Sequence, residues 1–348
     1  MATTRRPRPQ APAAASPKSS RSSAGQAALD VHRRIQRTQD RRDAEAKGGG
    51  ESPGGDDQAM QAGARTQPVD LPAQHLPKSG RESDLALAPR FLAPDYRGSG
   101  KLQDFAAIVT GGDSGIGRAV AVLFAREGAD VAIGYLSSDE DARETARCVE
   151  AEGRRCLLLQ GDVKDDAWCR EAVRRTVDAF GRLDVLVNNA AFQEHAESIE
   201  DIDDERLMTT VDTNLGGYFR MARAALPHLG RGASIINTGS VTGLEGSAKL
   251  LDYAATKGAI HAFTKSLASN LIGRGVRVNA VAPGPVWTPL NPADKPAEDV
   301  ARFGRQTDIG RVAQPEELSP AYVFLASPVC SGYITGVVLP VTGSVGAI

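Results

Sequence analysis

A tyrosine and a lysine four residues apart, Tyr253 and Lys257, follow a serine, Ser240, that lies thirteen residues before the tyrosine. Side chains four residues apart lie on one face of a helix, so the lysine ammonium can stand close to the phenol. At about 5 Å and an effective dielectric of about 20, the attraction to a phenolate is about 3 kcal/mol, or roughly two pKa units. A tyrosine pKa near 10 would then fall to about 8, which suits proton exchange with a substrate oxygen. Chance matches to this pattern are common, so its value depends on what precedes it.

A glycine-rich run precedes these residues. Residues 110–117 read Thr-Gly-Gly-Asp-Ser-Gly-Ile-Gly, between an apolar segment at 105–109 and a helical pattern at 116–126. A strand, a glycine turn and a helix form the setting of a dinucleotide-binding site, where backbone N–H groups and the helix dipole hold a pyrophosphate. The spacing is G-x-x-x-G-x-G, and the alternative is a tight turn that binds nothing.

Apolar segments alternate with helical patterns along the rest of the chain. The expected strands are 105–109, 131–135, 156–160, 185–188, 234–238, 277–281 and 337–339, and the expected helices are 116–126, 139–152, 166–180, 204–229, 253–272 and 315–326. Such alternation predicts an α/β fold, a doubly wound parallel sheet with helices on both faces. Ligands bind beyond the carboxyl ends of such strands, and Thr110, Asp162, Asn188, Ser240 and Pro283 each follow one.

In this order and at these spacings, the motifs at 110–117, 162–163, 188–190, 240, 253–257 and 283–288, together with Asn214, resemble the short-chain dehydrogenase/reductase family. The resemblance covers about residues 88–348. The segments 93–102, 110–117 and 283–289 are together most similar to a bacterial, glucose/ribitol-dehydrogenase-like subgroup with N-terminal extensions. It implies a seven-stranded Rossmann sheet of order 3-2-1-4-5-6-7. It also implies a homotetramer in which helices 204–229 and 253–272 pair across a two-fold axis.

The resemblance assigns catalytic roles to four residues. Tyr253 would be the general acid/base, and Lys257 would lower its pKa and bind the nicotinamide ribose. Ser240 would hold the substrate oxygen, with Ser247 a distant second candidate for that role. Asn214, which weakens the helix around it, would support a water that reaches Lys257.

The resemblance also implies a set of cofactor contacts. These are Gly111, Asp113, Ser114, Gly115, Ile116, Gly117, Asp162, Val163, Asn189, Ala190, Tyr253, Lys257, Pro283, Gly284, Val286 and Thr288. Asp162 would accept from the adenine amino group, although a helix N-cap is an alternative. Ala191 stands where many relatives have glycine, and its methyl group would tighten the neighbouring turn.

The choice between NAD and NADP depends on charge near the adenosine ribose. The end of the second expected strand, residues 134–138, contains neither an acid nor a cation, and Ser114 stands where NADP enzymes usually have Arg or Lys. Asp113 would repel a 2′-phosphate. We therefore expect NAD, with NADP as the alternative.

Composition separates the chain into two parts. Half of the 20 prolines lie before residue 95, and the first 85 residues are rich in Ala, Ser, Arg, Gln and Gly. Such a segment buries too little apolar surface to offset its chain entropy. We expect a disordered N-terminal tail at 1–87 and one catalytic domain at 88–348.

Net charge, hydropathy and cysteine content indicate which kinds of partner and which compartment the protein has. A net charge of −2 gives no case for nucleic-acid binding, and no apolar run is long enough to span a membrane. The four cysteines form no C-x-x-C pair, so we expect reduced thiols in a cytoplasmic protein and no metal site.

The substrate is not fixed by the sequence. The expected pocket comprises residues 191–198, 244–252 and 291–307, with 291–299 as a mobile lid. A sugar, a polyol or a small aldehyde would each suit an enzyme that transfers hydride between nicotinamide and an alcohol or carbonyl. The alternative is a non-catalytic dinucleotide-binding sensor or scaffold.

Overall fold

The expected strands form one parallel sheet in the computed structural model, which describes residues 30, 32–41 and 59–346. In chain order they are β1 (Ala106–Thr110), β2 (Asp130–Tyr135), β3 (Cys156–Gln160), β4 (Leu183–Asn188), β5 (Leu229–Thr238), β6 (Arg277–Pro283) and β7 (Val338–Val341). Their order across the sheet is β3-β2-β1-β4-β5-β6-β7, as the family resemblance implies. β1, β2 and β6 are buried along their whole length, as expected for apolar strands covered on both faces.

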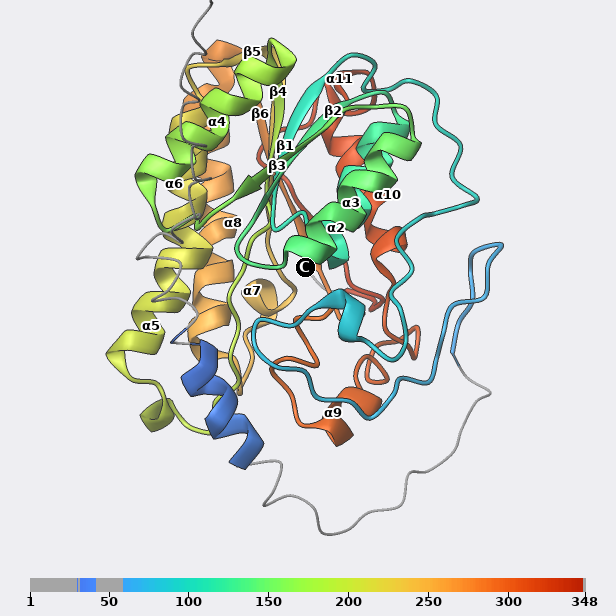
Figure 1. Ribbon diagram of the computed structural model, residues 1–348, viewed down its shortest axis with the longest axis vertical. Coiled ribbons are helices and arrows are strands. Elements are labelled where there is room, and N and C mark those ends of the chain that lie inside the picture. Colours follow the sequence, from blue (N-terminus) through green and yellow to red (C-terminus); the bar gives the residue numbers. More distant parts are fainter. Residues whose placement is uncertain (1–29, 31, 42–58, 347–348) are drawn as a thin grey trace, which may run out of the picture.

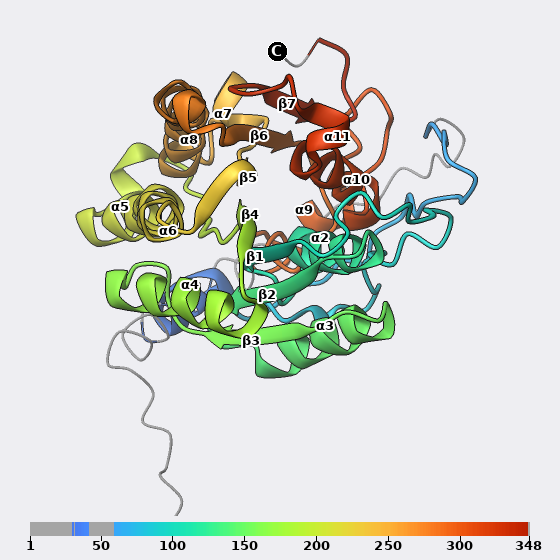
Figure 2. The ribbon, with the colours of Figure 1, turned by 90° about the horizontal axis from the view of Figure 1, so that it is seen from above.

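Helices cover both faces of this sheet (Figure 2). On one face lie α2 (Gly115–Arg126), α3 (Asp139–Ala151) and α10 (Pro315–Ala326), and on the other lie α4 (Asp166–Phe180), α6 (Gly217–Ala225) and α8 (Leu251–Leu271). Each helix packs apolar side chains on the strands, so the sheet separates two apolar cores. In the described parts of the chain, no helix combines the length and the apolar character that a membrane crossing needs.

The single helix expected at 204–229 is divided in the structure. It consists of α5 (Asp204–Val211), a π-helical segment η3 (Asp212–Gly216) and α6. The buried Asn214 lies in the π-helical segment, and its side chain bonds to the backbone of Phe192 instead of pointing to solvent. The expected end at residue 229 is wrong, because Leu229 begins β5 and pairs with Leu183.

Several short elements have no counterpart in the sequence pattern. They are α7 (Thr242–Glu245), α9 (Ala297–Ala301), α11 (Pro328–Ser331) and the 3-10 turns η1 (Glu82–Asp84), η2 (Ile199–Asp201) and η4 (Ile272–Arg274). Helices of one turn are too short to show a hydrophobic period. The segment expected as a mobile lid contains the start of α9 and the buried Asp294.

Residues 59–87, which we call the arm, pack on the domain in the structure. Figure 1 shows the arm crossing the end of the domain where α9 lies. Three arm leucines, Leu71, Leu76 and Leu85, form an apolar cluster with Trp287 and neighbouring side chains, and the Trp287 indole N–H donates to the Leu87 carbonyl at 2.8 Å.

The expectation of a disordered tail therefore fails for the arm. The arm contains no Phe, Tyr or Trp, but its leucines meet an apolar surface offered by residues 287–312. Residues 32–41 form a helix whose Gln39 side chain donates to the Asp294 carbonyl at 3.0 Å. The remaining tail residues, 1–29, 31 and 42–58, lie outside the described residues.

Candidate active and nucleotide-binding site

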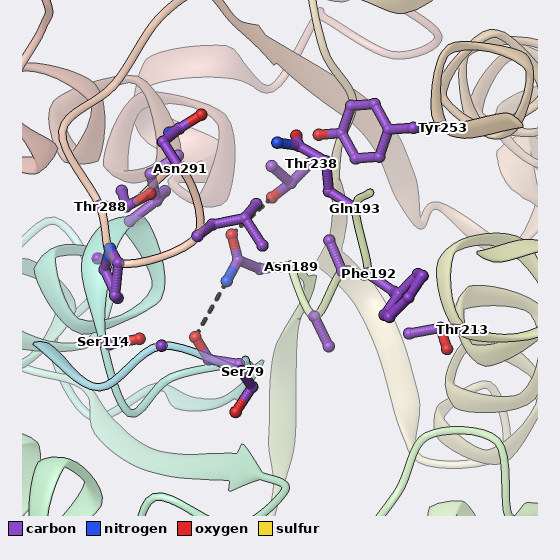
Figure 3. Close-up of a pocket in the computed structure, with 18 of the residues that line it drawn as sticks. Ser79, Ser114, Asn189, Phe192, Gln193, Thr213, Thr238, Tyr253, Thr288 and Asn291 are labelled. Atoms are coloured by element: carbon purple, nitrogen blue, oxygen red, sulfur yellow. Dashed lines mark hydrogen bonds between the residues drawn. The ribbon is translucent and has the colours of Figure 1, made fainter. Parts of the chain in front are cut away.

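One cavity of about 450 Å³ lies beyond the carboxyl ends of the strands. It is lined by the glycine turn after β1, the loops after β2 to β6, and part of the arm (Figure 3). Of the residues expected at the site, all except Gly117 and Asn214 line this cavity. The cavity therefore joins the expected cofactor residues to Tyr253 and Ser240.

Tyr253 and Lys257 lie in the first two turns of α8, on its buried face. The Lys257 Nζ atom is 5.4 Å from the centre of the Tyr253 ring and 5.6 Å from the centre of the Tyr218 ring. It donates a hydrogen bond to the Thr238 carbonyl at 2.8 Å, and the whole residue is 1% exposed. The helix thus fixes the lysine beside the phenol, as the four-residue spacing predicts.

The expected fall of the Tyr253 pKa is not found. Burial raises the pKa of Tyr253 above its ordinary value, and a hydrogen bond with Ser240 opposes this rise only in part. Burial also lowers the pKa of Lys257 to about 7. Loss of solvation penalises both charged forms, and here it outweighs the attraction estimated at a dielectric of about 20.

Ser240 follows β5 and is buried beside α8. Its hydroxyl accepts hydrogen bonds from the Thr242 backbone N–H at 3.1 Å and the Thr242 hydroxyl at 2.9 Å. The Ser240 N–H donates to the His261 Nε2 atom at 3.4 Å, and burial lowers the pKa of His261 to about 4. A neutral imidazole can accept this bond. These contacts hold the serine hydroxyl on the wall of the cavity.

Asn214 lies behind the cavity wall. Its side chain accepts from the Phe192 N–H at 2.7 Å and donates to the Phe192 carbonyl at 2.9 Å and the Thr256 hydroxyl at 3.1 Å. Both ends of the amide are therefore engaged with protein atoms. The side chain fixes the segment that follows β4, and Phe192 of that segment lines the cavity.

Close packing and a positive φ require glycine at two positions of the turn after β1. A Cβ atom at Gly117 would stand 1.9 Å from the Gly111 carbonyl oxygen, so only glycine lets α2 pack so close to the turn. Gly115 has a φ of +51°, and a Cβ there would stand 2.8 Å from the Thr288 side chain. Gly117 thus acts by close packing, whereas Gly111 and Gly115 line the cavity.

A carboxylate from the arm lies at the start of α2. Glu82 accepts from the Gly115 N–H at 2.6 Å and from the Arg118 guanidinium at 2.6 Å. Arg118 also donates to the carbonyls of Asp113 and Asp141, at 2.7 Å and 3.0 Å. The arginine is buried in these contacts and does not line the cavity.

Asn189 links three strand ends beside the glycine turn. Its amide donates to the carbonyls of Thr110 and Gly111, each at 3.1 Å, and accepts from the Thr238 hydroxyl at 3.2 Å. The Thr110 hydroxyl in turn accepts from the N–H groups of Asn189 and Ala190. The turn beside Ala191 therefore keeps these contacts.

The two remaining groups of expected contacts lie at opposite sides of the cavity. Asp162 and Val163 follow β3, and the Asp162 carboxylate accepts from the Lys164 N–H at 2.9 Å, so the side chain closes its own turn. Pro283, Gly284, Val286 and Thr288 follow β6, and the Val286 carbonyl accepts from the Asn291 amide at 3.0 Å.

Three contributors to the site carried no recognisable sequence signal. The Thr238 carbonyl accepts from both Lys257 and the Tyr218 hydroxyl. Trp168, on α4, lines the cavity beside β2 and β3, and its indole N–H donates to the Gln160 carbonyl. Arm and N-terminal helix residues, among them Lys78 and His32, also line the cavity. In the described ranges, no cluster of three or more His, Cys, Asp or Glu is arranged to hold a metal ion.

Comparison with known proteins agrees with this geometry. Residues 111–345 match the family model described as enoyl-(acyl carrier protein) reductase. The chain is 53% identical over 264 residues to the uncharacterized oxidoreductase YhdF of Bacillus subtilis (strain 168), which covers 76% of this chain and 91% of that protein. It is 47% identical over 279 residues to the glucose and ribitol dehydrogenase of Daucus carota, which covers 78% of this chain and 95% of that protein.

A solved structure supports the same assignment. A short-chain dehydrogenase from Burkholderia cenocepacia J2315, crystallised in complex with NADP, superposes with a TM-score of 0.65 at 37% identity, over 70% of this chain and 98% of that chain. The chain therefore belongs to the short-chain dehydrogenase/reductase family of nicotinamide-nucleotide-dependent oxidoreductases.

Proposed function

We propose that this enzyme interconverts an alcohol and a carbonyl compound, with Tyr253 as the general acid/base. The observation that carries the proposal is that one cavity joins the glycine turn after β1 to the Tyr253 and Ser240 side chains. A nucleotide on the turn and a substrate at the tyrosine would then share one space. The alternative, a non-catalytic sensor, would not need the acid/base pair at the inner end of that space.

Each residue of the proposed set has a distinct task. Bound nicotinamide supplies the hydride acceptor or donor. Tyr253 donates its hydroxyl proton to a carbonyl oxygen, or accepts one from an alcohol, and Ser240 holds that oxygen by a hydrogen bond. Lys257 is placed to bind the nicotinamide ribose and to favour the tyrosine anion whenever it carries its proton. Tyr253 is 8% exposed and Lys257 is 1% exposed, so most of the pair is shielded from water.

We propose NAD rather than NADP as the preferred cofactor. Among the described residues of the glycine turn and of the loop after β2, no Lys or Arg lines the cavity, whereas Asp113 does. Arg118, the nearest cation along α2, is held by Glu82. The NADP in the Burkholderia structure keeps NADP(H) as the second candidate, so cofactor titration must decide.

The substrate part of the cavity combines polar and apolar side chains. Gln193, His195, Asn291 and Lys295 line it, and Leu250 and Phe303 add apolar surface. Several donors and acceptors around one tyrosine suit a polyhydroxylated substrate such as a sugar or polyol, and a small aldehyde would also fit. The name of the Daucus carota relative favours the sugar and polyol class.

We also propose a homotetramer in the cytoplasm. Phe219 of α6 stacks on Phe263 of α8 with ring centres 3.9 Å apart, and Phe219 is 51% exposed. An aromatic pair across these two helices, with one ring exposed, suits the expected helix pairing about a two-fold axis. The four cysteines are free thiols, which suits a reducing compartment.

A substrate panel tests the proposed activity. Sugars, polyols, simple alcohols and the corresponding aldehydes would be assayed with NAD(H) and NADP(H), following reduced nicotinamide by fluorescence. Turnover of at least one alcohol/carbonyl pair is expected. Tight nucleotide binding without turnover across the whole panel would instead favour the sensor.

A further inference from the structure

The arm enters the cavity at residues 78–80. Lys78, Ser79 and Gly80 all line it, and Ser79 is among the side chains that surround the space in Figure 3. A Cβ atom at Gly80, whose φ is +81°, would stand 2.6 Å from the Pro289 carbonyl oxygen. The arm therefore lies directly against the loop that follows β6.

Lys78 is buried in this contact. Its side chain is 3% exposed, and its Nζ atom donates to the Gln193 carbonyl at 2.5 Å and contacts the Asp294 Oδ1 atom at 3.2 Å. It also lies 5.5 Å from the centre of the Phe192 ring. One ammonium thus links the arm, the segment after β4 and the loop after β6.

Asp294 is the buried partner that requires this charge. Its side chain is fully buried, and it accepts from the Gln193 amide at 2.8 Å, from the His195 N–H at 2.9 Å and from the His195 ring. Burial alone would raise the pKa of Asp294, but the Lys78 charge and the His195 and Gln193 hydrogen bonds hold that pKa below its ordinary value. The carboxylate is therefore ionised and depends on these partners.

The residues that Asp294 holds face the proposed substrate. Gln193 and His195 line the cavity, and Figure 3 shows Gln193 and Tyr253 on the same side of it. The Asp294 charge also acts on Tyr253, whose pKa it raises. A change in this cluster would alter both the shape of the substrate wall and the field at the acid/base group.

From this cluster we propose that Lys78 of the arm is a positioning residue of the active site. Its ammonium balances the buried Asp294 carboxylate and thereby fixes Gln193 and His195 against the substrate. The inference rests on the proposed oxidoreductase function and adds to it a contribution from outside the nucleotide-binding fold. A buried carboxylate left without its cation is costly, whereas removing both charges together is less so.

Kinetics of five variants, which include the single variant Asp294→Asn, test this inference. Lys78→Met should lower kcat/KM about tenfold or more, and Lys78→Arg should retain most activity because it keeps the charge. The double variant Lys78→Met/Asp294→Asn should recover part of the loss. Arg34→Met is the matched control, because Arg34 also precedes the domain but its partner Glu205 is half exposed.

The pH profile separates positioning from a merely structural role. Asp294 is faced by Lys78 from the arm, by Glu194 and His195 from the segment after β4 and by Lys295 from its own loop. With Lys78→Met, the Asp294 charge acts on Tyr253 with less compensation, so the acidic limb of the oxidation rate, where Tyr253 still holds its proton, should move to higher pH. The double variant should move it back.

The outcomes are distinct. Normal kcat/KM in Lys78→Met, or a double variant whose loss is the sum of the two single losses, would overturn the inference. If Lys78→Met does not fold, the kcat/KM values of Lys78→Arg, Asp294→Asn and the double variant are compared instead. A double variant that is tenfold less active than Asp294→Asn would then overturn the inference. An unmodified protein that turns over nothing would count against the proposed function instead.

Discussion

Lys257 directs its ammonium to the backbone carbonyl of Thr238 at 2.8 Å while standing 5.4 Å from the centre of the Tyr253 ring. The lysine is thus held by the end of β5 and does not depend on the phenol for its position. Since burial lowers the pKa of Lys257 to about 7 and raises the pKa of Tyr253, the lysine can be charged or neutral at neutral pH while the phenol keeps its proton. A buried lysine that titrates near neutral pH beside a phenol is typical of an acid/base site.

The stability of the protein should rise with pH because of Lys257. Its pKa is about 7 in the folded protein and 10.5 in the unfolded chain, so between these values the unfolded chain binds the extra proton. Folding is then favoured as pH rises, by about 3 to 5 kcal/mol across the window. Urea unfolding at pH 7 and pH 10 should show this gain in the unmodified protein and lose it in Lys257→Met. Equal pH dependence in the two would contradict the burial argument.

The arm should be needed for a stable domain. A chain beginning at residue 88 lacks Leu71, Leu76 and Leu85, each of which is worth about 1.5 to 3 kcal/mol when fully buried, and it exposes Trp287. We expect its melting temperature to fall and its activity to be lost. A chain beginning at residue 30 removes no contact described in the structure and is the matched control. Equal melting of both chains would show that the arm contributes nothing.

Cofactor preference should follow the charge near the adenosine ribose. NAD(H) should bind more tightly than NADP(H), and Ser114→Arg should strengthen NADP(H) binding about ten- to hundredfold by adding a cation. Ser114→Gln, which adds length without charge, should not. Fluorescence titration of NADH and NADPH measures both. If the unmodified protein binds NADPH more tightly, the NAD proposal fails and a cation outside the glycine turn must reach the phosphate.

The sheet could be predicted because each sequence pattern that indicates it lies within a few consecutive residues. Buried parallel strands are continuous apolar runs, and the glycine turn and the Tyr253–Lys257 spacing are contained within a few residues. The arm was not predictable, because its stability depends on a surface more than two hundred residues away, at Trp287. The Tyr253 pKa was misjudged for a related reason, because burial is a property of the packed domain and spacing does not report it.

The Lys78–Asp294 pair was also not predictable from the sequence. Each residue lies in a segment that reads as an unstructured stretch rich in Pro, Ala or charged residues, and neither has a partner nearby in the sequence. Only the folded chain brings the ammonium to the carboxylate. Long-range ion pairs of this kind leave no periodic pattern in the sequence.

Tyr253→Phe tests the central claim most directly. The substitution removes the hydroxyl and leaves the ring packed in place, so NAD(H) binding, followed by fluorescence, should stay close to normal. Turnover of the best alcohol/carbonyl pair should fall at least a hundredfold, in line with acid/base contributions of about 10² to 10⁴. Near-normal turnover in this variant would contradict the assignment of Tyr253 as the general acid/base.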